Sequence, residues 1–206
     1  MKIFKRLVIT FVILLVSIAV FIMANIYYSK YVSYPKWVEG YLQSRYTENM
    51  VIKNISFSDM GWLATVSPKS NPNIQFSVRG KHIDTYLERS LEYQAEQTLE
   101  ENYPAYSCQA QIFGYESIST PFPELYQFYQ ENGMPPRWSD LPDYIRLERL
   151  RINTYGNISD QDKQDIFKTI SEKGIRTNLV EIFDGDNMYT YKYDMNSGMY
   201  MDTTKP

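Results

Sequence analysis

The sequence predicts an α+β protein with one N-terminal transmembrane helix followed by two small modules, each an antiparallel sheet packed with helices. Three observations lead to this prediction: a long apolar run near the N-terminus, short segments in which apolar and polar residues alternate, and one segment with an apolar residue at every fourth position. The modules are expected at 31–120, in the order α-β-β-β-α-β, and at 144–206, in the order β-α-β-β. A proline-rich connection with a short helix, 121–143, is expected to join them.

The apolar run predicts a membrane anchor. The chain carries no charge between Arg6 and Lys30, and the span 7–28 matches the roughly 20 residues that a helix needs to cross the hydrocarbon core. Segment 1–30 is therefore expected to be a cytoplasmic stub and a single-pass anchor in the cell membrane. Basic residues and no acidic ones precede the run, so we expect the chain from Lys30 onward to lie outside.

A cleaved signal peptide is the competing interpretation of this segment. Its apolar region is usually about 7 to 15 residues long and ends in a small-x-small cleavage site. The run here is longer, and the best site, with Ile22 two residues before Ala24, matches that pattern poorly. The pattern favours an uncleaved anchor.

The composition limits the kinds of partner that the protein can bind. The chain has 206 residues and a net charge of −3. Its first 30 residues carry four basic residues and no acidic one, so the remainder carries −7. Nucleic-acid binding requires an excess of positive charge, so we expect no nucleic-acid partner. The single cysteine, Cys108, cannot form an intrachain disulfide, so packing has to stabilise the fold.

Periodicity places the elements of the first module. The expected elements are a helix over 35–46, strands over 51–57, 62–67, 74–78 and 106–112, and a long helix over 84–103. The long helix carries glutamates opposite its apolar stripe, at Glu88, Glu92, Glu96 and Glu100. We expect this row to be a solvated face, because the ligands of a calcium site converge from several directions.

The second module is expected to begin with a strand over 145–154. The parity of its apolar residues changes near Glu148 and Arg149, which indicates a bulge. A helix over 159–173, capped by Ser159, precedes a hairpin. The hairpin strands are expected at 179–183 and 188–194, with a ragged end from Gly198.

One tract resembles a known family. It contains Tyr41-Leu42, Ile55-Ser56-Phe57, Asp59-Met60-Gly61-Trp62 and the segment from Pro68 to Val78. Over about residues 35–110 the chain resembles the YfjL-like membrane-anchored proteins of Gram-positive bacteria. The resemblance implies a membrane-anchored protein and carries no activity, cofactor or site residue. The composition, rich in Tyr, Lys, Asn and Ile, is also typical of an AT-rich genome, such as that of a Gram-positive bacterium.

The sequence shows no residue set typical of catalysis, cofactor binding or metal binding. The only histidine, His82, lies in a predicted loop, and Cys108 lies within a predicted strand as a small core residue. We therefore expect no nucleophile–base pair and no enzyme. Four basic residues gather at Arg137, Arg146, Arg149 and Arg151. These are expected to form salt bridges on a surface strand, with contact to an anionic envelope polymer as the alternative.

A row of tyrosines is the candidate interaction surface. Tyr189, Tyr191 and Tyr193 alternate along the last predicted hairpin strand, so their rings lie on one face of it. We expect the row to be core, covered by the helix that carries Ile166, Phe167 and Ile170. An exposed strip for an interface or for sugar rings is the alternative.

These observations favour a non-enzymatic, single-pass membrane protein whose extracytoplasmic part contacts another envelope protein. Binding of an envelope polysaccharide is the second hypothesis, and a hydrolase with unidentified carboxylates is the third.

Overall fold

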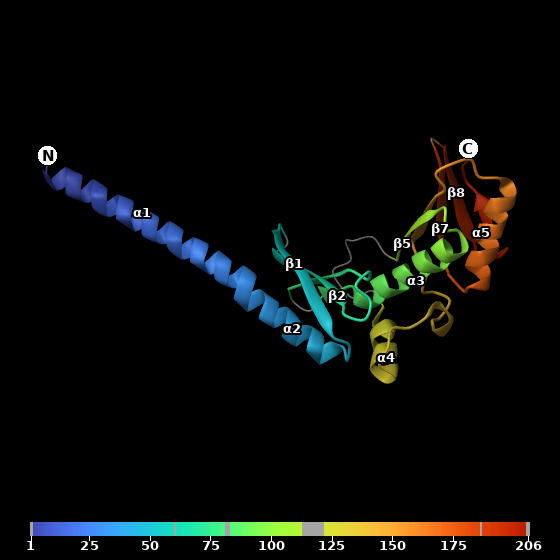
Figure 1. Ribbon diagram of the computed structural model, residues 1–206, viewed down its shortest axis with the longest axis horizontal. Coiled ribbons are helices and arrows are strands. Elements are labelled where there is room, and N and C mark those ends of the chain that lie inside the picture. The colour runs from blue at the N-terminus through green and yellow to red at the C-terminus, as the bar shows by residue number, and fades with distance from the viewer. Residues whose placement is uncertain (1, 60, 81–82, 113–121, 186, 205–206) are drawn as a thin grey trace.

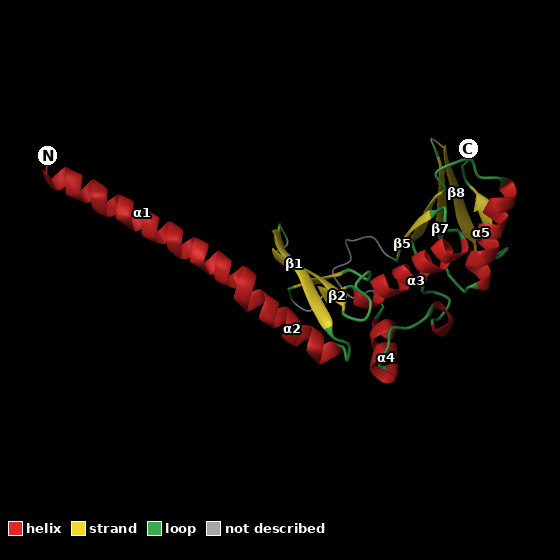
Figure 2. Cartoon of the chain, in the orientation of Figure 1, coloured by secondary structure: helices red, strands yellow, loops and turns green. Residues whose placement is uncertain are grey.

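The computed structural model describes residues 2–59, 61–80, 83–112, 122–185 and 187–204. It confirms the α+β class: a long N-terminal helix leads into a body that contains two sheets and the remaining helices. The helix projects away from the body, and the two sheets lie at opposite ends of it (Figure 1, Figure 2). One helix in the described part is long and apolar enough to cross a membrane.

This helix continues without a break into the body. The sequence pattern predicts separate helices, whereas α1 (Lys2–Tyr28) passes through a π-helical turn, η1 (Ser29–Ser33), into α2 (Tyr34–Arg45). Pro35 explains the wider turn, since its ring has no N–H and clashes with an ordinary α-helical carbonyl. The N–H of Tyr34 instead bonds to the carbonyl of Ser29, five residues back.

The first sheet is a four-stranded antiparallel meander in the order β1-β2-β3-β4. Its strands are β1 (Met50–Ser58), β2 (Gly61–Pro68), β3 (Phe76–Arg79) and β4 (Ile83–Asp84). The pairing of β1 with β2 shifts between Ile52 and Asn54, so the bulge falls at Lys53, the residue that interrupts the apolar alternation. Alternate residues of β2 and β3 are buried: Ala64, Val66, Phe76 and Val78.

A buried acid joins the N-terminal helix to the body. Asp84, only 4% exposed, accepts hydrogen bonds from the hydroxyls of Tyr41 (2.7 Å) and Tyr46 (2.6 Å). Its carboxylate lies 3.3 Å from Nε of Arg45 and also accepts from the N–H of Tyr86. Because the donors come from α2, from the residue that follows it and from Tyr86, which begins the next helix, this network fixes the N-terminal helix to the fold.

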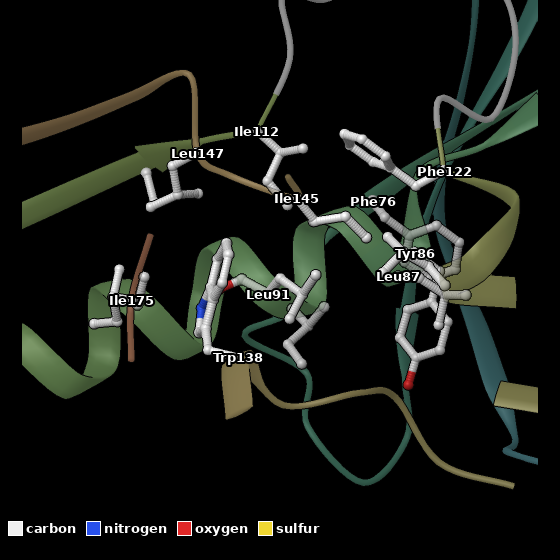
Figure 3. Packing of buried hydrophobic residues seen from close by; sticks show 14 of the residues in the cluster. Phe76, Tyr86, Leu87, Leu91, Ile112, Phe122, Trp138, Ile145, Leu147 and Ile175 are labelled. Atoms are coloured by element: carbon white, nitrogen blue, oxygen red, sulfur yellow. The ribbon is translucent and has the colours of Figure 1, made fainter. Parts of the chain in front are cut away.

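Helix α3 (Tyr86–Asn102) carries the chain from the first sheet to the second. Its predicted apolar stripe is buried, with Leu91, Ala95 and Leu99 all at 0% exposure. Trp138 packs beside Leu91 and donates from Nε1 to its carbonyl oxygen at 3.1 Å (Figure 3). Trp138 belongs to the connection, which contains α4 (Pro123–Asn132) and a 3₁₀ turn, η2 (Trp138–Asp140).

The second sheet has five strands in the order β5-β6-β7-β8-β9. They are β5 (Ser107–Gln111), β6 (Arg149–Asn153), β7 (Leu179–Asp184), β8 (Asn187–Asp194) and β9 (Met199–Asp202). The expected strand over 106–112 was placed in the first module, but β5, which it corresponds to, pairs with β6 of the second sheet. Alternation does not identify a strand's partner, and α3, at about 1.5 Å per residue, has carried the chain about 25 Å away from the first sheet.

The second sheet also departs from the expected antiparallel pattern. Strands β6 and β7 are parallel, because α5 (Asp160–Glu172) crosses over between them. The capping box of α5 is confirmed, since Oγ of Ser159 accepts from the N–H of Asp162. The module boundaries proposed from the sequence stay a prediction.

Candidate functional site

A groove of about 960 Å³ lies between α5 and the hairpin formed by β8 and β9. One wall comes from α5 and the residues that flank it, and the other comes from tyrosines of the hairpin. It is larger than the pocket beside α2, of about 450 Å³, and the pocket beside β5, of about 50 Å³. Its size is within the range of small-molecule and oligomer binding clefts.

Four aromatic rings line the groove. Phe167 of α5 lies edge-on to Tyr191, with centroids 4.8 Å apart, and stacks on Tyr200 at 5.0 Å. Tyr193 meets Tyr200 edge-on at 5.2 Å. These contacts hold the rings in fixed orientations, so the groove presents a pre-ordered aromatic surface.

The predicted tyrosine row lies on the covered face of the sheet. Tyr191 pairs with Val180 and is 8% exposed, and Tyr189 pairs with Ile182. Tyr189 and Tyr193 are half-buried. The row is therefore partly core and partly groove lining, and its role in binding stays a prediction.

Tyr200 was not identified from the sequence. It lies on β9, within the stretch expected to be ragged, and is opposite Tyr193 in the pairing of β8 with β9. Turn-forming residues in the sequence could have predicted this strand. Asp194 and Gly198 enclose the turn before it, in which Asp194 accepts from the N–H groups of Asn196 and Ser197. Burial raises the pKa of Tyr200 well above its usual range, so its hydroxyl stays neutral, and it donates to the carbonyl of Thr177 at 3.4 Å.

Two cations lie against the ends of the tyrosine row. The guanidinium of Arg146 lies over the ring of Tyr193, 4.5 Å from its centroid. Nζ of Lys163 lies 3.8 Å from the centroid of Tyr189 and 3.0 Å from a carboxylate oxygen of Asp160. The groove thus combines aromatic faces with fixed positive charges.

The three other residues of the predicted basic group lie outside the groove. Nε of Arg149 and of Arg151 lie 3.5 and 2.8 Å from the carboxylate of Glu181, as expected for a salt-bridged surface strand. Arg137 lies at the start of η2, where its N–H donates to Asp140. Only Arg146 of this group lines the groove.

The prediction that the glutamate row is a solvated face was wrong. Glu88 and Glu96 are buried, and three of the carboxylates accept hydrogen bonds from backbone N–H groups along β5. Glu100 accepts from Cys108 at 3.0 Å, Glu96 from Ala110 at 3.0 Å, and Glu92 from Ile112, just past the strand, at 2.8 Å.

Helix and strand geometry explain this match. Four residues advance a helix by about 6 Å, and two residues advance a strand by nearly 7 Å, so alternate N–H groups meet successive glutamates. The row covers an edge that would otherwise offer unpaired donors to another chain. In the sequence, glutamates that bond to a strand edge have the same four-residue spacing as glutamates on a solvated helix face, so the spacing does not distinguish the two.

His82 and Cys108 are the other residues considered for catalysis. His82 lies outside the described residues. Burial and the neighbouring glutamates raise the pKa of Cys108 to about 12, so its thiol stays protonated and is a poor nucleophile. Among the described residues, no three His, Cys, Asp or Glu side chains are grouped so as to hold a metal ion.

No family model matches the chain, and neither a curated protein nor a solved structure matches it. The resemblance of residues 35–110 to the YfjL-like membrane-anchored proteins therefore stays a prediction.

Proposed function

We propose that the chain is a single-pass membrane protein that binds an envelope polysaccharide, through the groove between α5 and the β8–β9 hairpin, outside the cytoplasm. The observation that carries the proposal is the pre-ordered set of rings, Phe167, Tyr191, Tyr193 and Tyr200, in an open groove. Aromatic faces stack on the apolar faces of sugar rings, while tyrosine hydroxyls and charged neighbours can bond to sugar hydroxyls.

The N-terminal helix supports anchoring. Its large apolar side chains are exposed along α1, for example Leu14 at 55% and Phe21 at 70%, and a lipid bilayer would cover them. The basic residues before the run favour a cytoplasmic N-terminus. The helix continues into α2, which the Asp84 network fixes to the body, so the groove is held on a rigid extension of the anchor.

The test replaces one groove ring that is not part of the core. Tyr193→Ala is expected to weaken retention of the full chain, in detergent, on protein-free envelope polysaccharide by about three- to tenfold, the range for a lost aromatic contact. Tyr144→Ala is the matched control, because Tyr144 is 60% exposed and lies outside the groove. Both variants should melt within a few degrees of the parent. If the parent and Tyr193→Ala are retained equally and melt at the same temperature, the groove is not the polysaccharide-binding site.

Contact with another envelope protein is the second candidate. Phe57 favours it, because this ring is 69% exposed on β1, which lies at the edge of the first sheet. Loss of a co-purifying membrane protein in Phe57→Ser, with polysaccharide retention unchanged, would support this candidate over the first.

A further inference from the structure

We propose that the polysaccharide bound in the groove is anionic, a glycan that carries carboxylate or phosphate groups at repeated positions. This inference rests on the proposed function, since it names the chemical class of ligand for the same groove. It is argued from the position, the pairing and the balance of the charges there.

The two cations are spaced so that each can contact a different acidic group along one polymer chain. Arg146 lies over Tyr193 and Lys163 over Tyr189, so the positive groups stand at the two ends of the tyrosine row. Four strand residues separate those ends by about 13 Å. A polymer lying along the groove would place its sugar rings against the exposed parts of the groove's aromatic rings and its acidic groups near both cations.

Both cations are available to a ligand. Among the described residues Arg146 forms no ion pair, and its Nε donates only to the backbone carbonyl of Asp143. Lys163 is paired with Asp160, whose side chain is 95% exposed, so a ligand anion can replace this carboxylate beside Lys163 without burying it. Lys163 itself is only 8% exposed, so a ligand anion would meet a partly desolvated charge there, where attraction is stronger.

The charge balance of the groove is opposite to that of the chain around it. Four basic and three acidic side chains line the groove, which is a net charge of +1. The chain beyond residue 30 carries −7. General attraction to an anionic polymer is therefore unfavourable, and the groove is the place where such a polymer gains favourable contacts.

The experiment removes one class of group from the ligand at a time. The full chain in detergent is applied to envelope material from the source cells in four forms: untreated, with carboxylates reduced, with phosphodiesters hydrolysed, and with protein digested. We expect reduction to abolish retention if carboxylates are recognised, hydrolysis to do so if phosphates are, and digestion to leave retention unchanged.

Each other outcome has a defined meaning. Retention that survives both chemical treatments overturns the anionic ligand and leaves polysaccharide binding in place. No retention on untreated material, or loss only after digestion, overturns the proposed function as well, and the latter result indicates a protein ligand.

Variants locate the effect within the groove. Arg146→Gln and Lys168→Gln, the latter on the exposed rim, are expected to weaken retention by about two- to fivefold each, with the larger effect at Arg146. Raising the salt concentration should reduce the difference between parent and variant. Lys69→Gln removes an exposed charge from the first sheet's loop and is expected to leave retention unchanged. Equal retention by parent and Arg146→Gln would overturn the proposed role of the cations.

Discussion

Glu88 should make the stability of the fold depend on pH. The side chain is 7% exposed, and no described residue hydrogen-bonds to its buried Oε1. Burial raises its pKa from 4.5 to about 7, and repulsion from Asp84 and Glu92 adds to the effect, while Arg45 opposes it. The folded state therefore holds this proton more tightly than the unfolded chain, so folding stability is lost as the pH rises from about 4.5 to about 7.

The size of the effect follows from these pKa values. Each pH unit between them corresponds to about 1.4 kcal/mol, so the ionised carboxylate costs about 3 kcal/mol at pH 8. Glu88→Gln keeps the shape of the side chain and removes the titration. We expect the free energy of unfolding of this variant, relative to the parent, to rise by about 2–3 kcal/mol between pH 5 and pH 8.

The assay is urea unfolding of the full chain in detergent, followed by tryptophan fluorescence at several pH values. Glu101→Gln is the control, because Glu101 is exposed on the same helix. A difference between Glu88→Gln and the parent that does not change from pH 5 to pH 8 would show that Glu88 does not titrate in this range, and would refute the reasoning.

Two further predictions concern α3. Leu91→Ala should lower the free energy of unfolding by about 2–5 kcal/mol, because Leu91 is at 0% exposure. The control Gln97→Ala, on the exposed face of the helix, should change it little. A loss below about 0.5 kcal/mol for Leu91→Ala would place Leu91 on the surface. Glu96→Ala should cost about 2–4 kcal/mol and speed amide exchange at Ala110, because the Ala110 N–H loses its acceptor and the Arg89 guanidinium keeps only its bond to Glu92. Unchanged exchange at Ala110 would contradict the edge-capping role of the glutamates.

The periodic elements could be predicted from the sequence because each has one buried face. The stripe of α3, the strands of the first meander and the capping box at Ser159 all lie where the pattern places them. Local patterns record which side of an element is buried, and that information is contained within each segment.

The partners of these elements could not be predicted in the same way. The position of β5 in the second sheet and the parallel pairing of β6 with β7 depend on where α3 and α5 carry the chain. The candidate groove was predicted only in part: the tyrosine row was identified, but Tyr200 lies on β9, a strand that forms against β8 and has a weak pattern of its own. Phe167 was predicted as a core residue. It also lines the groove, and this could not be predicted because its ring stacks on Tyr200 of β9, the strand that the sequence pattern did not predict.

The orientation of the anchored groove is the central claim, and thiol labelling tests it most directly. In a Cys108→Ala background, Ser197→Cys places one thiol in the exposed turn between β8 and β9, beside the groove. A membrane-impermeant maleimide added to intact cells should label this cysteine in full-length protein of about 24.3 kDa that remains in the membrane fraction. Phe4→Cys, on the other side of the apolar run, should react only after the cells are opened. Labelling of Ser197→Cys only after lysis, or recovery of labelled protein that lacks the N-terminal helix, would contradict the account.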